Sequence, residues 1–370
     1  MFKKIGRRAV LLLPIGLLAA FALPEASPAQ EKKGKLGIIV QLTGSSATYG
    51  IGIQHAVEIA RQEMKDAGLI DIETYYEDHQ QQPQLAVQGL QKLADTQDIK
   101  LILANSSPIN LAMNPFAAER GILIYNYNAV SPALRALAPW IINGNPLADV
   151  DGKKLAEYMI AQGHKTAGVI SQNSEFGEAV SAAFNRFYEE AGGKVVAHEV
   201  SDERVFDMRT QLLKIKDANP QALVIFLNIP ENGYTVAQAR EIGLNAQIYS
   251  NQFILSPDNF KVAGDAMNGV KGVSPKFDPE APNAKGFADK FNAAAGRPPQ
   301  ASDAFAYDGA RMIGEAIAAV GEDPKAVREY ILKLKDWPGA VGNYNFDADG
   351  VADLPFQFYE VKDQKAVFTD

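Results

Sequence analysis

A glycine pair, Gly50-Ile51-Gly52, opens a predicted helix within the stretch QLTGSSATYGIGIQHA (41–56). Such a pair could cradle the pyrophosphate of a dinucleotide. That fingerprint needs its first glycine close behind a strand and a third glycine at the sixth position of the motif. Here the seven residues 43–49 separate the apolar run from Gly50, and His55 stands at the third glycine's place. The spacing therefore disfavours a dinucleotide-binding enzyme.

Other catalytic patterns are missing from the sequence. It contains no G-x-x-x-x-G-K-[ST] phosphate loop and no G-x-S-x-G nucleophile elbow. The four histidines are isolated, without the paired spacing of metal ligands, and we interpret them as surface or packing residues: His55, His79, His164 and His198. We expect no enzymatic activity, no cofactor and no metal.

The acidic stretch FDADGVAD (346–353) has the composition of a calcium loop. An EF-hand loop places glycine at its sixth position and glutamate at its twelfth. If Asp347 is counted as the first position, Gly350 is the fourth and Phe358 is the twelfth. A polar hairpin turn accounts better for these residues.

The first thirty residues have the order of a secretory signal peptide. Basic residues lie within 3–8, an apolar run covers 9–23, and Ser27-Pro28-Ala29 precedes Gln30. The apolar run is shorter than the roughly 20 residues that span a bilayer. We expect cleavage of residues 1–29 and a mature protein in a compartment outside the cytoplasm.

The mature chain is acidic and lacks cysteine. It keeps 32 Lys and Arg against 43 Asp and Glu, a net charge of about −11, which argues against nucleic-acid binding. Without cysteine it has no disulfide, no thiol nucleophile and no lipid-modified N-terminal cysteine. Its 341 residues exceed what one core usually organises, so we expect two lobes.

Short apolar runs recur along the chain and alternate with stretches of helical periodicity. Runs of this length are typical of strands buried on both faces of a parallel sheet: 35–42, 100–104, 121–127, 165–171, 221–227 and 246–250. Two stretches place apolar residues on one helix face: Val57, Ala60, Met64 and Ala67 in the first, and Val180, Ala183, Phe184, Phe187 and Ala191 in the second. This alternation predicts an α/β fold with right-handed crossovers.

Two segments share one pattern of strand, polar loop, aromatic-glycine pair and helix. They are GIIVQLTGSSATYG (37–50) and GVISQNSEFG (168–177). The similarity supports two related lobes, and chance similarity between two βα units remains the alternative.

Three stretches, together with the signal peptide, carry a family resemblance: LTGSSATYGIGIQHAVEIA, LANSSPINLAMNPFAAERGILIYNYNAVSPAL and QNSEFGEAVSAAF. The chain resembles the branched-chain amino acid (Leu/Ile/Val) binding proteins, the type I periplasmic solute receptors of ABC importers. The resemblance extends over nearly the whole mature chain. It implies two lobes, each a parallel sheet flanked by helices, joined by three hinge crossovers. Lobe 1 would comprise 31–144 plus 276–345, and lobe 2 would comprise 145–275 plus 346–370.

In lobe 1, strand 100–104 runs into Ser107 and Pro108, which we interpret as the N-cap and first residue of a helix. A helix N-terminus with a hydroxyl can receive a carboxylate, or the serine can serve only its helix. By resemblance, Ser107 matches the family's carboxylate-binding serine. Asn128, Ala129 and Val130 match the segment that grips the amino-acid head of the ligand, with Val130 in place of the usual threonine.

In lobe 2, the resemblance implies that Phe176 covers the ligand and that Asn228 and Ile229 face the pocket. Gln252 matches the acid that normally pairs with the ligand's ammonium group. A neutral amide cannot make that charge-assisted bond, and an unpaired buried ammonium is costly. The ligand-binding set therefore favours a small carboxylate without an amine, such as an aromatic acid or a branched 2-oxo acid. Tyr49, Tyr127 and Phe176 could enclose its apolar part.

The resemblance implies an extracytoplasmic receptor that delivers this ligand to the permease of an ABC importer, and we expect a monomer. A receptor for branched-chain or other hydrophobic amino acids remains an alternative. A ligand sensor would share the same pocket, and a secreted α/β enzyme would reveal itself by turnover of its bound ligand.

Overall fold

Two main β-sheets organise the chain, for which the computed structural model describes residues 1–2 and 32–369. The predicted signal peptide lies outside the described residues, apart from Met1 and Phe2. The first sheet is entirely parallel, with the order β2-β1-β3-β4-β5. Its strands are β1 (Lys33–Val40), β2 (Asp71–Asp78), β3 (Leu101–Ala104), β4 (Leu123–Asn126) and β5 (Ile141–Asn143).

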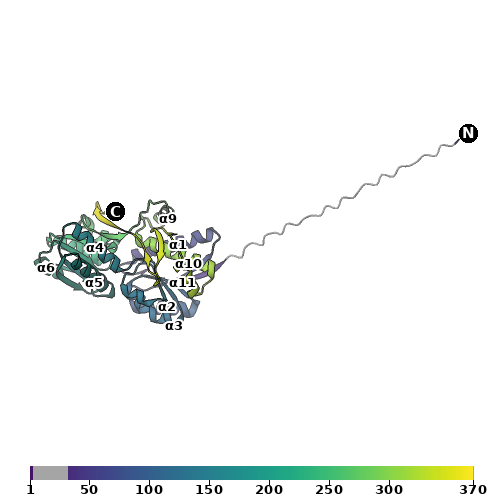
Figure 1. Cartoon of the computed structure of the whole chain (residues 1–370), viewed down its shortest axis with the longest axis horizontal. Coiled ribbons are helices and arrows are strands. Elements are labelled where there is room, and N and C mark those ends of the chain that lie inside the picture. Colours follow the sequence, from purple (N-terminus) through teal and green to yellow (C-terminus); the bar gives the residue numbers. More distant parts are fainter. Residues whose placement is uncertain (3–31, 370) are drawn as a thin grey trace. The chain divides into compact units, whose positions relative to one another are not determined.

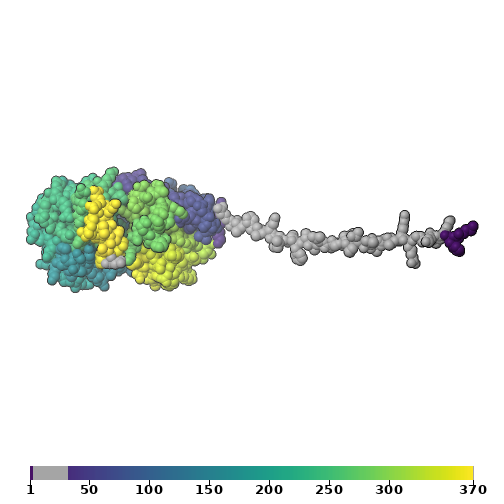
Figure 2. Space-filling view, turned by 90° about the horizontal axis from the view of Figure 1, so that it is seen from above, coloured from purple at the N-terminus to yellow at the C-terminus, as the bar shows by residue number. Residues whose placement is uncertain are grey.

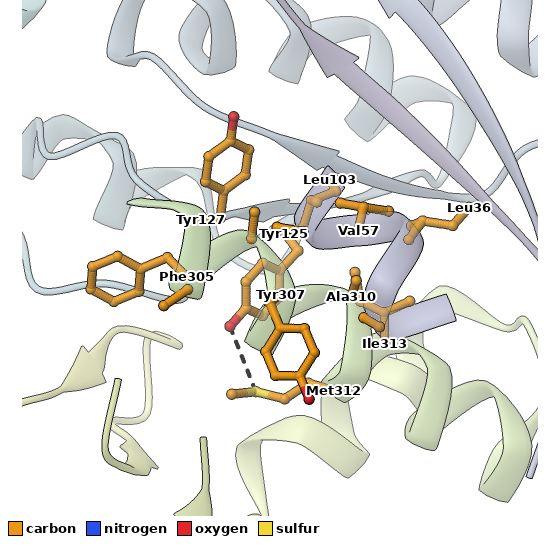
Figure 3. Packing of buried hydrophobic residues seen from close by; sticks show 14 of the residues in the cluster. Leu36, Val57, Leu103, Tyr125, Tyr127, Phe305, Tyr307, Ala310, Met312 and Ile313 are labelled. Carbon is orange, nitrogen blue, oxygen red and sulfur yellow. Dashed lines mark hydrogen bonds between the residues drawn. The ribbon is translucent and has the colours of Figure 1, made fainter. Parts of the chain in front are cut away.

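Helices cover both faces of the first sheet. They are α1 (Ala47–Asp66), α2 (Pro83–Gln97), α3 (Ser107–Arg120), α9 (Lys285–Ala295), α10 (Ala301–Val320) and α11 (Pro324–Leu332), with the 3-10 helix η1 (Pro132–Leu137). Figure 3 shows the core on the α1 and α10 side, where Val57 and Ala310 pack near Leu103 and Tyr125. The helices α2 and α3 bury a second cluster, which includes Leu90, on the opposite face.

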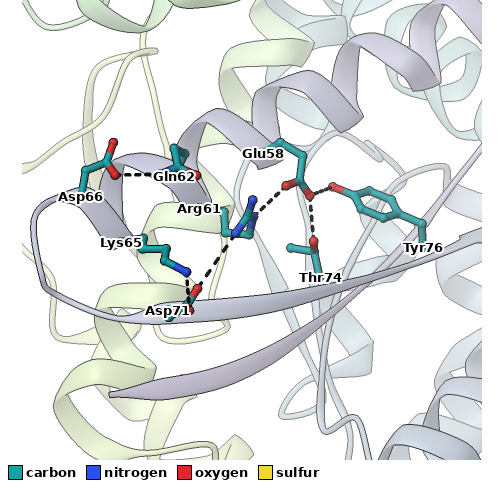
Figure 4. A network of polar contacts seen from close by, with 8 residues as sticks. All are labelled: Glu58, Arg61, Gln62, Lys65, Asp66, Asp71, Thr74 and Tyr76. Atoms are coloured by element: carbon teal, nitrogen blue, oxygen red, sulfur yellow. Dashed lines mark hydrogen bonds and ion pairs between the residues drawn. The ribbon is translucent and has the colours of Figure 1, made fainter. Parts of the chain in front are cut away.

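The outer edge of the first sheet is polar. Figure 4 shows how α1 is tied to β2: the Glu58 carboxylate accepts hydrogen bonds from Thr74 and Tyr76, and Lys65 pairs with Asp71 at 2.7 Å. Such a strand needs few apolar residues, because its outward side chains bond to polar groups of the helix or to water.

The second sheet has the order β15-β14-β10-β9-β8-β6-β7. Strands β6 to β10 are parallel, and β14 and β15 add an antiparallel hairpin at one edge. The strands are β6 (Thr166–Gln172), β7 (Lys194–Ser201), β8 (Ala222–Phe226), β9 (Gln247–Ser250), β10 (Lys271–Pro275), β14 (Phe356–Lys362) and β15 (Lys365–Thr369). The hairpin departs from the expected all-parallel lobe.

The helices of the second sheet form a separate group, in which Figure 1 labels α4, α5 and α6. They are α4 (Ala148–Ala161), α5 (Glu175–Glu190), α6 (Arg209–Asp217), α7 (Glu231–Glu241) and α8 (Pro257–Ala263), with the 3-10 helices η2 (Gln252–Leu255) and η3 (Gly264–Met267). The chain passes between the sheets three times, after β5, after β10 and before β14. The predicted two-lobe α/β fold is confirmed, while the bounds 31–144 plus 276–345 and 145–275 plus 346–370 stay predictions.

The acidic stretch 346–353 forms a hairpin turn, as predicted. It joins β12 (Asn343–Phe346) to β13 (Ala352–Asp353), which pair antiparallel beside β11 (Trp337–Pro338). The Asp347 carboxylate accepts bonds from the backbone N–H groups of Asp349 and Val351 at 3.0 and 2.9 Å, and pairs with Arg135 at 2.6 Å. These carboxylates are therefore used within the fold.

Candidate functional site

The carboxyl ends of the parallel strands converge on one region. Gln41, His79 and Asn105 directly follow β1, β2 and β3, three neighbouring strands of the first sheet. Ser174 and Asn228 follow two neighbouring strands of the second sheet, β6 and β8. All five line one cavity, in agreement with the rule that open α/β sheets bind ligands beyond the carboxyl ends of their strands.

This first cavity has an empty volume of about 670 Å³ and receives side chains from both lobes. Seven of the nine predicted site residues line it: Tyr49, Ser107, Asn128, Ala129, Phe176, Asn228 and Ile229. Gln252 lines an adjoining second cavity instead, and Val130 lines neither. The structure thus brings most of the predicted set together around one space.

The Ser107 hydroxyl lies at the start of α3, but its predicted role as N-cap is wrong. The helix begins at Ser107, and the cap position is Ser106, whose φ of +70° lies in the left-handed region. The Ser107 oxygen accepts a hydrogen bond from the Ser131 N–H at 3.1 Å. Its own hydrogen is then left to donate into the cavity, which Ser107 lines.

A chain of hydrogen bonds separates the two cavities. The Gln252 amide donates to the Asn128 oxygen at 2.8 Å, and the Asn128 amide donates to the Tyr49 hydroxyl at 2.9 Å. Burial raises the pKa of Tyr49 to about 12, so its hydroxyl stays protonated at neutral pH. The buried oxygen of Gln252 has no hydrogen-bond partner among the described residues.

The backbone oxygen of Ala129 is already occupied. It accepts hydrogen bonds from the side-chain amides of Asn126 at 2.8 Å and Asn145 at 3.1 Å, which fill both lone pairs. Val130 follows it in a buried apolar cluster of the second lobe. A ligand ammonium would therefore find neither a free carbonyl nor a hydroxyl at these two residues.

Lobe 2 closes the cavity with an aromatic pair and a backbone contact. Phe176, at the start of α5, packs edge to face against Phe253 with ring centroids 5.3 Å apart. The Ile229 oxygen accepts a hydrogen bond from the Ser46 hydroxyl of lobe 1 at 2.5 Å, and Ser46 in turn accepts one from the Gln81 amide. The lobes are therefore in direct contact around the cavity.

His79 lines the cavity, although sequence analysis interpreted it as a packing or surface residue. Its side chain is buried, and its Nδ1 accepts the Gln81 N–H at 2.9 Å, so the neutral ring carries its proton on Nε2. Burial lowers its pKa to about 4, against weaker opposing effects of Asn105 and Asp78. Neither Nε2 nor the Asn105 amide oxygen makes a hydrogen bond of acceptable geometry to any described residue. His79 is thus a neutral buried donor.

Glu203 is the only acidic side chain among the described residues that line the first cavity. Burial raises its pKa, while Arg204 acts in the opposite direction. It follows β7, at the edge of the second sheet. Sequence analysis missed it, and its place just after a strand was the available signal.

The glycine pair of the opening stretch has a packing role. A β-carbon on Gly50 would overlap the backbone oxygen of Gln41, and one on Gly52 would meet the paired side chains of Arg297 and Asp303.

Among residues 1–2 and 32–369, no group of three or more His, Cys, Asp or Glu is placed to hold a metal ion. No helix in that part of the chain is long and apolar enough to cross a membrane.

Comparison with known proteins agrees with the geometry. A Leu/Ile/Val-binding protein homolog of Brucella abortus is 26% identical over 331 residues, covering 86% of this chain and 88% of that protein. Two solved structures share the fold. The leucine-binding protein LivK of Thermotoga maritima has a TM-score of 0.85, 22% identity and coverage of 91% of this chain and 97% of its own. An ABC-transporter solute-binding protein of R. palustris, in complex with benzoate, has a TM-score of 0.83, 20% identity and coverage of 90% and 94%.

The family assignment rests on most of the chain, since residues 33–366 match the periplasmic binding proteins. Proteins of this family are extracytoplasmic and take part in transport. The chain belongs to the periplasmic binding protein family, whose members bind substrates for ABC transporters and are not enzymes.

Proposed function

We propose that the protein is an extracytoplasmic receptor that captures a small carboxylate without an α-ammonium group and delivers it to the permease of an ABC importer. An aromatic acid or a branched 2-oxo acid fits this description. The observation that carries the proposal is the occupied Ala129 oxygen, which accepts two amide hydrogen bonds from the protein itself. An ammonium group in the cavity would lack this acceptor.

The donors around the cavity suit a carboxylate. Ser107 has a hydroxyl hydrogen to donate, and the neutral His79 ring lines the same cavity beside the Asn105 side chain. A carboxylate accepts up to about four hydrogen bonds, and bonds to a charged acceptor are roughly twice as strong as neutral ones. Ligand binding would satisfy groups that are otherwise buried without partners.

By resemblance, Gln252 matches the acid that pairs with a ligand's ammonium group, and it lines the adjoining second cavity. Its amide nitrogen already donates to Asn128, and its charge is zero. The Gln252→Glu variant adds a carboxylate beside the first cavity. We expect this change to weaken carboxylate binding by repulsion and to improve any weak affinity for leucine or phenylalanine.

Calorimetric titration tests the proposal. Wild-type protein, free of bound ligand, is titrated with benzoate, 4-methyl-2-oxopentanoate, leucine and phenylalanine, and Gln252→Glu is titrated with the same panel. Gln91→Glu, on the exposed face of α2, introduces the same charge away from both cavities and serves as the control. If wild-type protein binds leucine or phenylalanine but binds neither benzoate nor 4-methyl-2-oxopentanoate, the proposal is wrong.

A receptor for hydrophobic amino acids is the second candidate, because Glu203 lines the cavity and could pair with an ammonium group. The relatives named for leucine, isoleucine and valine binding point the same way. Under this alternative, Glu203→Gln abolishes leucine binding. Under the carboxylate proposal, the same variant binds benzoate at least as tightly as wild type, since a nearby negative charge is removed.

A further inference from the structure

A second cavity adjoins the first. Its empty volume is about 1340 Å³, and the two cavities share Tyr49, Asn128, Ile229 and Phe253 as common walls. Figure 2 shows a hollow in the surface beside the C-terminal strand, drawn in yellow, and residues of that strand line the second cavity. The two cavities are therefore direct neighbours with a common wall.

The two cavities differ in chemistry. The first is lined mainly by amide, hydroxyl and imidazole groups, whereas the second is lined largely by aromatic, aliphatic and proline side chains. Phe253, Leu255 and Phe260 come from the segment after β9, and Phe277 and Phe368 close other sides. An apolar space beside a polar one suits a ligand with an apolar body and a polar end.

The wall of the second cavity is held in place. The Gln300 amide donates to the Leu255 oxygen across the lobes, and Gln300 forms a capping box with Asp303 at the start of α10. Asp303 is almost fully buried and pairs with Arg297 at 2.7 Å, and Arg297 also lies over the Phe291 ring. These contacts hold the loop before α10 in place, and this loop forms one wall of the second cavity.

A single polar junction lies between the cavities. It consists of the neutral hydrogen bonds from Gln252 to Asn128 and from Asn128 to Tyr49. The buried oxygen of Gln252 lacks a partner among the described residues, and the side chain itself is only half-buried. A rotation of Gln252 would break only one neutral hydrogen bond at this junction, the bond to Asn128.

We infer that the ligand is an elongated amphipathic carboxylate, with its carboxylate in the first cavity and its apolar chain or ring extending past Gln252 into the second. This inference rests on the proposed function and narrows its substrate class. A benzoate or a branched 2-oxo acid is short enough to stay within the polar cavity, while an aryl-alkanoate also buries apolar surface against the aromatic walls. Each buried methylene increases the affinity by about fourfold.

A series of phenyl-substituted acids of increasing length tests the inference. Calorimetry measures the affinity of wild-type protein for benzoate, phenylacetate, 3-phenylpropanoate and 5-phenylpentanoate. We expect the affinity to rise along the series by about fourfold for each added methylene. An affinity for 5-phenylpentanoate no higher than that for benzoate overturns the inference and leaves the proposed function standing. Failure of every acid in the series, together with failure of 4-methyl-2-oxopentanoate, overturns both.

A variant that fills the second cavity with a phenylalanine side chain, compared with a control variant, gives a matched test of the inference. Ala366 lines only that cavity, from β15, so Ala366→Phe should bring the affinity for 5-phenylpentanoate down to that for benzoate. Ala293→Phe places the same ring on an exposed position of α9, away from both cavities, and should keep the full gain. If Ala366→Phe does not fold, Ala301→Phe fills the same cavity from the start of α10. A full gain in a folded, filled variant contradicts the inference.

Discussion

The Ser107 hydroxyl has two roles, which separate measurements of affinity and of stability can distinguish. Its oxygen accepts the buried Ser131 N–H, and its hydrogen can donate to a ligand. We expect Ser107→Ala to weaken benzoate binding by about 1 to 2 kcal/mol, the contribution of one hydrogen bond to a charged group. Calorimetry measures the affinity, and thermal unfolding in the same buffer measures the stability lost with the Ser131 bond. Ser107→Thr keeps the hydroxyl and should bind normally, whereas equal affinity of the alanine variant would place the ligand elsewhere.

Residue His79 makes stability depend on pH. Burial lowers its pKa to about 4 in the folded protein, against about 6.5 for an unfolded histidine. The unfolded chain therefore takes up a proton on acidification before the folded one does. The contribution of His79 to the free energy of unfolding is complete above pH 6.5 and is lost as the pH falls towards 4, by about 2 kcal/mol between pH 7 and pH 5.

Asp151 acts in the opposite direction, because burial raises its pKa to about 7 and its contribution to stability grows on acidification. The informative quantity is therefore the difference in unfolding free energy between wild type and His79→Gln, measured by urea denaturation at pH 7 and pH 5. We expect this difference to shrink by about 2 kcal/mol at the lower pH. A difference that does not change with pH would mean that the native imidazole titrates normally.

The sequence identified most, but not all, of the cavity. Motif resemblance supplied Tyr49, Asn128 and Phe176, which all line it. It missed Gln41, His79 and Asn105, although each directly follows a strand of the first sheet. His79 could not be recognised because β2, the strand before it, is an edge strand with a polar outer face and lacks the apolar run that marks a buried strand. Its burial arises only when α2 and the neighbouring strands pack together.

At the scale of elements, one physical reason explains why the segments 37–50 and 168–177 share a sequence pattern. Gly50 follows Tyr49 in the first turn of α1, and Gly177 follows Phe176 in the first turn of α5. A β-carbon on Gly50 would overlap the backbone of Gln41, and one on Gly177 would overlap the backbone of Gln172. In each lobe, glycine lets the first turn of a helix approach the end of a strand and directs the preceding aromatic ring into the cavity.

Substitution of these glycines should therefore displace a helix. We expect Gly50→Ala or Gly177→Ala to lower the free energy of unfolding by about 3 kcal/mol, because neighbouring backbone cannot move aside cheaply. Gly286, in α9, is exposed, and a β-carbon added there would meet no other atom within 4 Å, so Gly286→Ala should instead stabilise the protein by about 0.5 to 1 kcal/mol. Urea denaturation compares the three variants. Equal effects at all three positions would exclude close packing as the cause.

The predicted strands are confirmed where the chain is most deeply buried. All six apolar runs are strands, as predicted, because central parallel strands bury both faces. Edge strands such as β7 alternate exposed and partly buried residues, and sequence analysis did not identify them. Ala67 and Ala191, predicted on buried helix faces, are exposed because each lies just after the last turn of its helix. Periodicity finds the middle of an element better than its ends.

At the scale of the whole receptor, several hydrogen bonds join the lobes around the cavity. Ser131 donates to the Glu175 carboxylate at 2.6 Å, and Arg204 donates to the Gln80 oxygen at 2.8 Å. These bonds exist only while the lobes touch. The Gln41 side-chain oxygen is buried without a partner among the described residues, so a ligand that donates to it would make a bond that the closed lobes shield from water. Ligand binding should therefore favour the closed arrangement.

Glu175 tests the contribution of closure to affinity, because it bonds across the lobes and lines neither cavity. We expect Glu175→Ala to weaken benzoate binding by about 1 kcal/mol without touching the ligand, since part of the binding energy must then replace the missing bond. Calorimetry gives the affinity. Glu178→Ala, one turn along α5 and also outside both cavities, is the matched control and should bind like wild type. Equal affinities in the two variants would show that this contact does not stabilise the closed state.

Hinge closure itself should be visible in solution. Three crossovers connect the lobes, so one can rotate against the other, and a ligand that contacts both lobes lowers the free energy of the closed state alone. Moving the population from 1% to 99% closed requires about 10⁴-fold tighter binding to the closed state. Small-angle scattering should show a smaller radius of gyration when a carboxylate that calorimetry finds to be tightly bound is added to saturation. Glu175→Ala should need more ligand for the same compaction, because its closed state is less stable. A radius that stays constant at saturation would mean that the lobes close before the ligand arrives or never open.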